Sequence, residues 1–464
     1  MNILFVITNI NGTYNDAYSF GLASIASITR DKGFNYDIKV INKIEDYDDL
    51  FDAVERIKPK VIGYSSVSSQ FMFVKDISSK IKARFHDNII QVCGGIHPTI
   101  YPECILETEM IDGIFIGEAE YAFSDFLDRV SNGIPYKDVK NFAYNNNGTL
   151  VKNSLYPLET ELEKLPFPER EKYGYDRFVK RDGIAHFLFA RGCPYNCSFC
   201  CNQAKAQTYN MRINTPRYRS PESSIEEIKR LLKKFSFSKI FISDDTFGVN
   251  KKWMREFCNK YAKEIRLPLC CQLRVNIVNE EIMEYLKLAG CVHVTCGVES
   301  GNTYIRKEIM KKNYSEKQIV NAYSLFKKYG MTSNVTNIIG VPQDTVDTIW
   351  DTIKLNRKIN PTSSGVNIFY PYRGTELGNY CFKKGLIDED IFNKFSTERR
   401  ESCLNFPAEF KKKLVYFHRN WQLLVYKHRP LKFLYYSLLK YMPTPLLNTL
   451  RFIKRRLYMV FPGW

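Results

Sequence analysis

The sequence predicts an α/β protein with two successive parallel sheets and a helical end. The first sheet is expected to be doubly wound (Rossmann-like), the second to form a partial (β/α)6 barrel, and the C-terminal region to be helical and basic. Three observations carry this prediction. Short apolar runs alternate with helix-like segments over 1–131 and again from residue 184, a connector with turn-forming residues separates the two series, and basic residues concentrate after residue 398.

The first series contains five apolar runs that we expect to be strands. They are Ile3–Thr8, Asp37–Ile41, Lys60–Ser65, Ile89–Cys93 and Gly113–Ile116, and a helix over Ala119–Val130 closes the series. In a doubly wound sheet, ligands bind beyond the carboxyl ends of the strands. Polar residues and glycines gather at three of those ends, namely Ser65, Ser66, Ser68, Gly94, Gly95, His97, Thr99, Gly117 and Glu118. Paired glycines let backbone approach a bulky ligand closely.

The connector contains turn signals but no chemistry of its own. Its stretch Asn145-Asn146-Asn147-Gly148 predicts a hairpin turn. Two prolines stiffen the later stretch 165–170. We therefore expect a first domain over 1–140, a linker over 141–182, a barrel over 183–385 and a helical basic region over 386–464.

The second series contains six apolar runs, as a partial barrel requires. They are Ile184–Ala190, Lys239–Ser243, Leu269–Leu273, Val292–Cys296, Thr332–Ile339 and Ser363–Phe369. The chemistry of such a barrel belongs at the carboxyl ends of its strands. The distinctive residues at those ends are Asp244, Asp245, Glu299, Ser300, Asn337 and Gly340. Taken alone, each carboxylate is explained as well by a solvated loop acid or a helix cap.

Three cysteines follow the first run of this series, at the spacing Cys193-x3-Cys197-x2-Cys200. Three thiolates on one short loop hold three irons of a [4Fe–4S] cluster and leave the fourth iron open to a substrate. A zinc site would need a fourth Cys or His at knuckle spacing, and none follows nearby. Cys201 is expected to be a packed thiol. Only Cys381 and Cys403 follow the barrel, too few for an auxiliary cluster, and only Cys93 and Cys104 precede it, one short of the three that a second cluster needs.

This cysteine motif, with the aromatic Phe199 before its last member, resembles that of the radical S-adenosylmethionine (SAM) superfamily. The resemblance implies that Phe199 lies in the SAM site and that Asp244 or Asp245 contacts the SAM amino group. It further implies that Glu299 and Ser300 lie at the ribose hydroxyls, and that Asn337 and Gly340 lie against adenine.

The strand ends of the first series resemble the cobalamin-binding domain that precedes many radical SAM cores. The sequence lacks the Asp-x-His-x-x-Gly motif that supplies a histidine to cobalt in other cobalamin proteins, and only His97 lies at a strand end. The resemblance implies that cobalamin binds through the nine residues listed above, with its own base displaced and no histidine on cobalt. The alternative is a domain that keeps the fold and binds nothing.

Together these resemblances imply methyl transfer to an unactivated carbon of a small-molecule or lipid-linked substrate, with a [4Fe–4S] cluster, SAM and cobalamin as cofactors. An external reductant such as flavodoxin or ferredoxin would supply the electron. Radical cyclisation, oxidation or rearrangement without methyl transfer is an alternative, and a non-catalytic cobalamin or redox sensor is an alternative of another class. The sequence singles out no catalytic side chain.

The net charge of +17 belongs largely to the C-terminal region, where 399–464 hold 14 Lys or Arg against two acids. It therefore indicates no nucleic-acid partner. Apolar residues recur at helical spacing from Leu431 to Met442 and from Leu446 to Leu457, and Trp464 ends the chain. These helices are expected either to lie on an anionic membrane or to cap the barrel. The longest uncharged stretch of this C-terminal region, Tyr441–Leu450, is too short to span a bilayer.

The 13 cysteines follow no disulfide framework, and no secretory leader is evident at Met1. Both features predict a cytoplasmic protein, with peripheral contact to the cytoplasmic membrane face if the C-terminal helices bind lipid.

Overall fold

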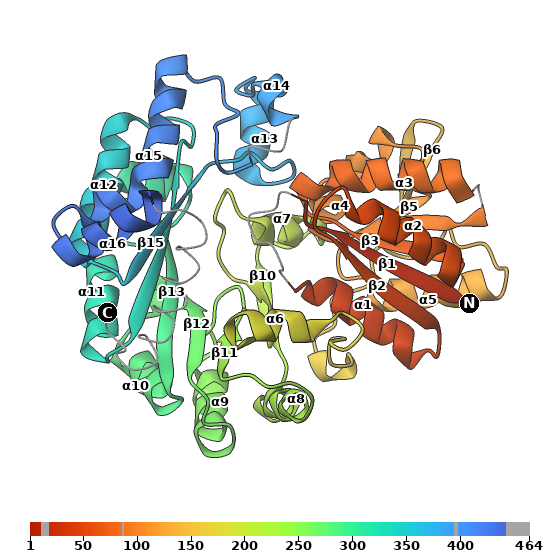
Figure 1. Cartoon of the computed structure of the whole chain (residues 1–464), viewed down its shortest axis with the longest axis horizontal. Coiled ribbons are helices and arrows are strands. Elements are labelled where there is room, and N and C mark those ends of the chain that lie inside the picture. Colours follow the sequence, from red (N-terminus) through yellow and green to blue (C-terminus); the bar gives the residue numbers. More distant parts are fainter. Residues whose placement is uncertain (11–17, 86–87, 394–397, 442–464) are drawn as a thin grey trace.

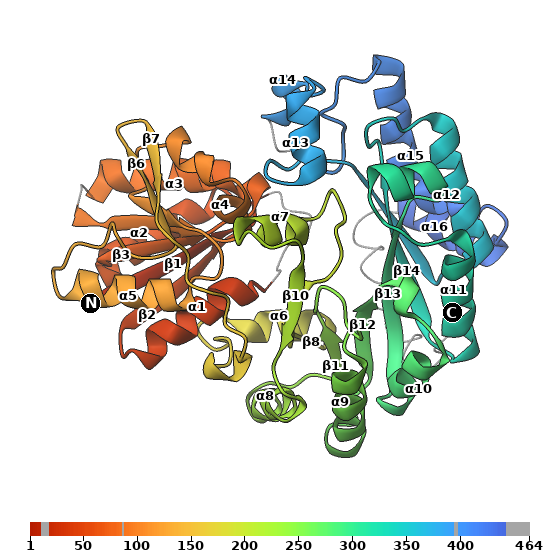
Figure 2. The same ribbon diagram turned by 180° about the vertical axis from the view of Figure 1, so that it is seen from behind.

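The computed structural model describes residues 1–10, 18–85, 88–393 and 398–441. Two α/β bodies lie side by side in it, the N-terminal one coloured red and orange and the barrel coloured green and cyan (Figure 1). Seen from behind, helix α7 (Cys201–Thr208) lies between the two bodies (Figure 2). The predicted α/β fold class is confirmed, with one parallel sheet in each body and helices at the C-terminal end.

Seven strands form the N-terminal sheet, in the order β2-β1-β3-β4-β5-β6-β7. The first five are parallel, and the strand order reverses at β1, as in doubly wound folds. All five predicted runs are strands. Their bounds are β1 (Asn2–Thr8), β2 (Asn35–Ile41), β3 (Val61–Ser65), β4 (Ile90–Gly94) and β5 (Gly113–Phe115).

Helices cover both faces of this sheet because its central strand is apolar on both sides. Ile3 and Phe5 pack toward α1 (Phe20–Asp31) and α5 (Glu120–Ser131). Leu4 and Val6 pack toward α2 (Asp46–Ile57) and α3 (Phe71–Phe85), as the alternation of side chains along a strand requires. The short helix α4 (Ile96–Ile100) lies at the carboxyl edge.

The predicted hairpin turn is confirmed. β6 (Phe142–Asn146) and β7 (Thr149–Lys152) pair antiparallel, with Asn147 and Gly148 at φ 50° and 85°. The hairpin extends the N-terminal sheet, since β6 also pairs with β5. The chain then passes through α6 (Tyr175–Asp182) into the barrel.

Six parallel strands form the barrel sheet, in the order β15-β14-β13-β12-β11-β8. The strands are β8 (Ile184–Phe187), β11 (Lys239–Ile242), β12 (Leu269–Leu273), β13 (Cys291–Glu299), β14 (Thr332–Ile339) and β15 (Ser363–Ile368). The helices between them are α8 (Pro221–Lys234), α9 (Lys251–Glu264), α10 (Glu280–Leu288), α11 (Glu316–Lys328) and α12 (Val346–Ile359).

The first barrel strand is shorter than the predicted run Ile184–Ala190. The Asp244 carboxylate accepts hydrogen bonds from the backbone N–H groups of Phe189 and Ala190, which takes these residues out of the barrel sheet. The chain instead starts a separate strand, β9 (Ala190–Cys193), which pairs antiparallel with β10 (Asn214–Tyr218).

The C-terminal helices are α13 (Glu376–Lys383), α14 (Glu389–Phe392), α15 (Ala408–Tyr426) and α16 (Pro430–Tyr441). Leu414, Phe417 and Trp421 of α15 are buried against β14, β15 and α12, so α15 caps the barrel. The predicted helix from Leu431 is confirmed through Tyr441, whereas the second apolar run and Trp464 lie outside the described residues. No helix within the described ranges is long and apolar enough to cross a membrane.

Candidate active site at the domain interface

The three predicted cluster ligands lie on one loop after β9. Cys193 is the last residue of β9, and Cys200 is the N-cap of α7. Cys197 between them is buried. Each thiolate binds a different iron in a four-iron cluster, so the sulfurs need not converge on one point. Among the described residues, no three His, Cys, Asp or Glu side chains converge as ligands of a single metal ion.

A buried arginine faces Cys197. Arg274 directly follows β12, and its Nη1 donates a hydrogen bond to Cys197 Sγ over 3.1 Å. Its guanidinium lies 3.9 Å from the ring centroid of Tyr195. Burial alone would lower the pKa of Arg274, but the Cys197 sulfur raises it overall, so the side chain stays charged. Arg274 was not among the site residues predicted from the sequence. Its position directly after a barrel strand is a signal that could have identified it.

The two aspartates after β11 differ in what they contact. Asp244 is buried, and its Oδ1 accepts hydrogen bonds from Phe189 N at 2.7 Å and Ala190 N at 3.1 Å. Burial raises the pKa of the Asp244 carboxyl to about 7. Asp245 is exposed. Asp244 therefore holds the chain that leads into the cluster loop, while Asp245 is available at the strand end.

Glu299 ends β13 in a strained backbone conformation, at φ 66°. Its Oε1 pairs with Lys312 Nζ at 2.8 Å, and Lys312 also donates to Gly297 O at 2.9 Å. A Cβ on Gly297 would lie 2.1 Å from Glu299 Oε1, so this glycine makes room for the carboxylate. Burial alone would lower the pKa of Lys312, but the neighbouring Glu299 raises it overall, so the lysine stays charged. Lys312 is a second site residue that the sequence prediction missed.

The remaining predicted SAM residues are packed within the barrel. Phe199 joins an apolar cluster with Ile338, and Lys312 Nζ lies 5.9 Å from its ring centroid. Ser300 Oγ accepts from Asn302 N at 3.2 Å. Asn337 is fully buried, with Nδ2 donating to Gly365 O at 2.8 Å. Gly340 has φ 76°, and its N–H donates to Asp344 Oδ2 at 2.7 Å.

The predicted cobalamin residues lie along the carboxyl edge of the N-terminal sheet, where hydrogen bonds join their loops. Gly95 has φ 103°, and a Cβ there would lie 2.6 Å from Ser66 O. Thr99 Oγ1 donates to Gly95 O at 2.7 Å and accepts from Gly117 N at 2.9 Å. Three strand-end loops are thereby joined, and only glycine fits at Gly95. Gly94, in contrast, has open space beside it, since a Cβ would meet only Phe115 Cβ at 3.9 Å.

His97 is turned into this edge. Its Nδ1 lies 3.1 Å from the Oγ of Ser68, which begins a short helical turn a few residues after Ser65 ends β3. Its ring lies 4.7 Å from that of Phe71, centroid to centroid. Burial, reinforced by Lys75 and Arg373, lowers the pKa of His97 to about 4, so the imidazole is neutral near pH 7.

Glu118 joins the two bodies through two barrel arginines. Arg191 Nη1 donates to Glu118 Oε2 at 3.0 Å, and Arg217 Nη1 donates to the same oxygen at 3.1 Å. Arg191 also pairs with Glu120 at 2.6 Å. Although burial opposes ionisation, these two arginines hold the pKa of Glu118 at about 2. The Glu118 backbone N–H donates to the hydroxyl of Tyr209, just after α7, at 2.7 Å. The predicted cobalamin residue Glu118 thus has its carboxylate on the barrel side.

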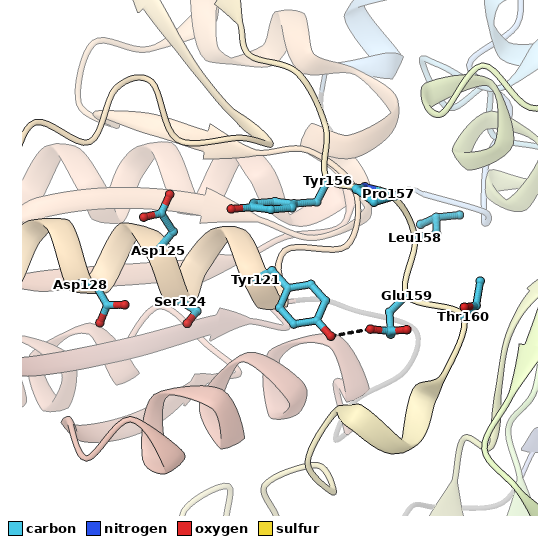
Figure 3. Close-up of a pocket in the computed structure, with 9 residues that line it drawn as sticks. All are labelled: Tyr121, Ser124, Asp125, Asp128, Tyr156, Pro157, Leu158, Glu159 and Thr160. Carbon is cyan, nitrogen blue, oxygen red and sulfur yellow. Dashed lines mark hydrogen bonds between the residues drawn. The ribbon is translucent and has the colours of Figure 1, made fainter.

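An open hollow of 770 Å³ lies beside α5, away from these residues. Tyr121 donates a hydrogen bond to Glu159 across it, and Asp125, Asp128 and Tyr156 also line it (Figure 3). It contains none of the predicted cofactor residues. Its link to the interface is Glu159, whose backbone O accepts from Arg217 Nη1 at 2.7 Å.

The residues present fit the implied groups. A thiol set on one loop with a cation at its buried member suits an anionic iron–sulfur cluster. Buried charges at the barrel edge suit a zwitterionic cosubstrate. Gly94 and the neutral His97 leave an edge with room and little charge, which suits a corrinoid.

Comparison with known proteins agrees with the interpretation of both the barrel and the N-terminal domain. A model of the radical SAM superfamily matches residues 187–355, and a model of the B12 binding domain matches residues 8–127. The uncharacterized methyltransferase PH0819 of Pyrococcus horikoshii is 29% identical over 384 residues, which are 81% of each chain. An anaerobic magnesium-protoporphyrin IX monomethyl ester cyclase of Rubrivivax gelatinosus is 26% identical over 71% of this chain, which spans 60% of the cyclase.

Among solved structures, the radical SAM methyltransferase TsrM of Kitasatospora setae, with cobalamin and a [4Fe–4S] cluster bound, has the same fold. Its TM-score is 0.68 at 16% identity, over 82% of this chain and 75% of that one. The chain therefore belongs to the radical SAM superfamily, among the members that carry an N-terminal B12-binding domain. Its cofactors are a [4Fe–4S] cluster, SAM and cobalamin.

Proposed function

We propose that this enzyme transfers a methyl group from cobalamin to an unactivated carbon of a small-molecule substrate. The observation that carries the proposal is the position of α7. This eight-residue helix, about 12 Å long, begins at Cys200 and ends at the N-terminal edge, where Thr208 Oγ1 donates to Thr99 O over 3.2 Å. The cluster loop and the corrinoid edge are thus held one short helix apart, as cooperation of both cofactors on one substrate requires.

When bound, the cluster and SAM supply a hydrogen-abstracting radical, and the corrinoid supplies a methyl group. In this proposal, Cys193, Cys197 and Cys200 bind three irons, and Arg274 stabilises the Cys197 thiolate. Asp245 contacts the SAM amino group, while Asp244 fixes the strand before the loop.

In the same proposal, Lys312 fixes the position of Glu299, which accepts hydrogen bonds from the ribose. Ser300, Asn337, Gly340 and Phe199 shape the SAM pocket behind it. On the other edge, Ser65, Ser66, Gly94, Gly95, Thr99 and Gly117 provide the corrinoid surface. His97 bonds to Ser68 instead of binding cobalt. Glu118 acts from behind this edge, by holding it to the barrel.

The experiment is a product analysis on the anaerobically reconstituted enzyme. Mass spectrometry of extracts from a gene deletion, compared with the parent, would first identify the substrate. Methyl transfer predicts one 5′-deoxyadenosine and one S-adenosylhomocysteine for each product molecule, and deuterated SAM should label the product methyl. A Cys197→Ala variant, as the matched control, should form neither compound.

Radical cyclisation or oxidation is the second candidate, because the Rubrivivax gelatinosus relative is named a cyclase. Formation of 5′-deoxyadenosine without S-adenosylhomocysteine, on the true substrate, would favour it. A purely sensory protein would cleave no SAM under either condition.

We further propose that α16 touches the cytoplasmic membrane face and gives access to a lipid-linked substrate. Its outward leucines support this, since Leu431, Leu434 and Leu438 are 71%, 57% and 44% exposed. The exposed Lys427 and Arg429 precede them, and basic residues favour an anionic surface by about 1 kcal/mol each. Flotation with anionic liposomes should be lost when the three leucines become serine, and kept when the exposed Leu288 does. If the parent chain does not float, α16 is only part of the cap.

The external electron donor, flavodoxin or ferredoxin, and the cytoplasmic location remain parts of this proposal. Reduction of the cluster by purified flavodoxin, followed by the SAM-perturbed signal, tests the first of these.

A further inference from the structure

A pocket of 340 Å³ lies in the seam between the two bodies, separate from the cluster loop. Its N-terminal wall comes from α3 and α4, and its opposite wall comes from the segment after β15 and from α14. Figures 1 and 2 both show α13 and α14 beside α3 and α4 at this end of the seam. The volume lies at the small end of ligand pockets and is far too small for a corrinoid.

Half of the residues that line the pocket carry aromatic rings. On the N-terminal side, the ring of His97 lies 4.7 Å from that of Phe71 and 5.7 Å from that of Tyr101, between centroids. On the other side, Tyr370 lies 5.2 Å from Phe392 in a stacked arrangement. His97 is neutral near pH 7, so it acts as one more flat ring. Such walls favour a planar, unsaturated ligand.

One cation in this wall lacks a counter-charge. Arg373 is held among rings, 3.8 Å from the Phe382 centroid and 5.4 Å from the Tyr101 centroid. Among the described residues, no carboxylate pairs with it. Lys75, the other cation in the wall, already pairs with Glu107 at 3.0 Å. Glu107 also lines this pocket, but its carboxylate is paired with Lys75. A half-buried guanidinium that contacts rings and has no carboxylate partner offers its N–H groups to an anion.

The chain segment that contains Arg373 also contacts the cluster loop. Arg373 is followed by Gly374, where a Cβ would lie 1.9 Å from Ile100 O of α4. Three residues later, Leu377 N donates to Ser198 O, inside the cluster loop, over 2.8 Å. One short segment therefore lines the pocket, touches the N-terminal edge and contacts the loop that carries the cysteines.

We propose that this pocket binds a small planar organic anion, a carboxylate or phosphate on an aromatic body, with Arg373 as its anion-binding residue. The ligand contacts both bodies, so its binding favours the arrangement in which the two walls face each other. This site does not depend on methyl transfer, because it requires only the two walls and Arg373.

The test measures binding of 1-naphthoate and 1-naphthyl phosphate to the full chain loaded with cluster and cobalamin, by anaerobic calorimetry. The uncharged 1-naphthamide is the matched probe. At least one anion should bind about ten- to a hundredfold more tightly than the amide, the range of one charge-assisted hydrogen-bonded contact. Arg373→Gln should remove that preference, whereas Lys384→Gln, an exposed lysine on the same segment, should not.

Three results would overturn the proposal. The first is equal binding of the anions and the amide, and the second is that no probe binds saturably. The third is that Arg373→Gln binds the anions as well as the parent does. A further control separates the corrinoid: Arg373→Gln should take up cobalamin as the parent does. If it instead loses cobalamin, the pocket serves the corrinoid and the proposed free ligand is wrong.

Discussion

The two sheet edges that face each other across the seam are built by opposite means. The barrel edge contains buried charges that are paired within the barrel, Arg274 with Cys197 and Lys312 with Glu299. The N-terminal edge contains glycines and a neutral His97 instead. The carboxylate of Glu118, which lies on this edge, pairs with Arg191 and Arg217 of the barrel.

The difference follows from what each edge holds. An anionic cluster and a zwitterionic cosubstrate gain most from charges fixed in place before binding, because no reorganisation is then needed. A corrinoid is large and contacts its site over a wide surface, so clearance matters more than charge. We therefore expect substitutions at the barrel edge to act through electrostatics, and substitutions at the glycines of the N-terminal edge to act by steric hindrance.

The largest effect is expected from Arg274→Met, which leaves the Cys197 thiolate buried without its donor. Losing one partner of a buried charged pair costs about 3–5 kcal/mol. The variant should therefore bind less iron and lose the SAM-perturbed cluster signal in electron paramagnetic resonance. Arg274→Lys, which keeps the charge, should retain part of both. Full iron content and an unchanged signal in Arg274→Met would refute the electrostatic account of this edge.

The sequence was sufficient for the parts of this site that depend on local spacing. The cysteine motif places its three ligands on one loop whatever surrounds them, and the strand order follows from the alternation of runs. Arg274 and Lys312 were not predictable with the same ease, because each acts on a partner 77 or 13 residues away. Which cation meets which anion is decided by packing, and one sequence contains no record of it.

The next largest effect is expected from Glu118→Ala, which tests the charges that the N-terminal edge gives to the barrel. The Glu118 side chain is 26% exposed, so its removal from this ion group should cost about 2 kcal/mol, the low end of the range for a buried hydrogen-bonded charge pair. Hydrogen exchange should rise in α7 and β9, and the denaturation midpoint of the full chain should fall. Glu159→Ala is the control and should change little, because it removes only the carboxylate bonded to Tyr121 and keeps the backbone oxygen that accepts from Arg217.

The same ion group predicts that the contribution of Glu118 to the free energy of unfolding depends on pH. The folded pKa of Glu118, about 2, lies below its usual value of 4.5. Its stabilising contribution is therefore complete above about pH 4.5 and is lost as the pH falls toward 2. The stability difference between the parent and Glu118→Ala should shrink across that window. A difference that stays constant from pH 5 to pH 3 would contradict the ion group as its source.

A smaller effect, due to space, is expected at the paired glycines. Gly95→Ala would drive a Cβ into the backbone of Ser66 at a positive φ, so the loop must move at a cost of about 1–3 kcal/mol. Gly94→Ala has room in the ligand-free fold and should leave stability unchanged. If both variants lose cobalamin but only Gly95→Ala loses stability, the corrinoid approaches Gly94 directly. Normal cobalamin uptake by both would leave the clearance hypothesis without support.

The aspartate pair shows where spacing stops being informative. Asp244 and Asp245 follow the same strand, and the sequence predicts a SAM contact for one of them without distinguishing the two. The difference depends on the turn of the chain after β8, which brings the N–H groups of Phe189 and Ala190 to Asp244. Asn337 is similar, since its amide bonds to Gly365 O and Asn356 only once β15 and α12 have packed.

The smallest effect on stability is expected from this pair, and it separates their roles. Asp245→Asn should weaken SAM binding by about 1.5–3 kcal/mol, the worth of a charge-assisted hydrogen bond, and leave the unfolding midpoint unchanged. Asp244→Asn keeps an oxygen for the two N–H groups and removes a buried ionisable group. The folded pKa of Asp244, about 7, lies above its usual 3.8, so its contribution to stability is complete below pH 3.8 and declines as the pH rises to 7. The Asn variant should therefore gain stability over the parent between pH 5 and pH 7.5 in urea titrations, with SAM affinity preserved. Weaker SAM binding in Asp244→Asn but not in Asp245→Asn would exchange the two assignments.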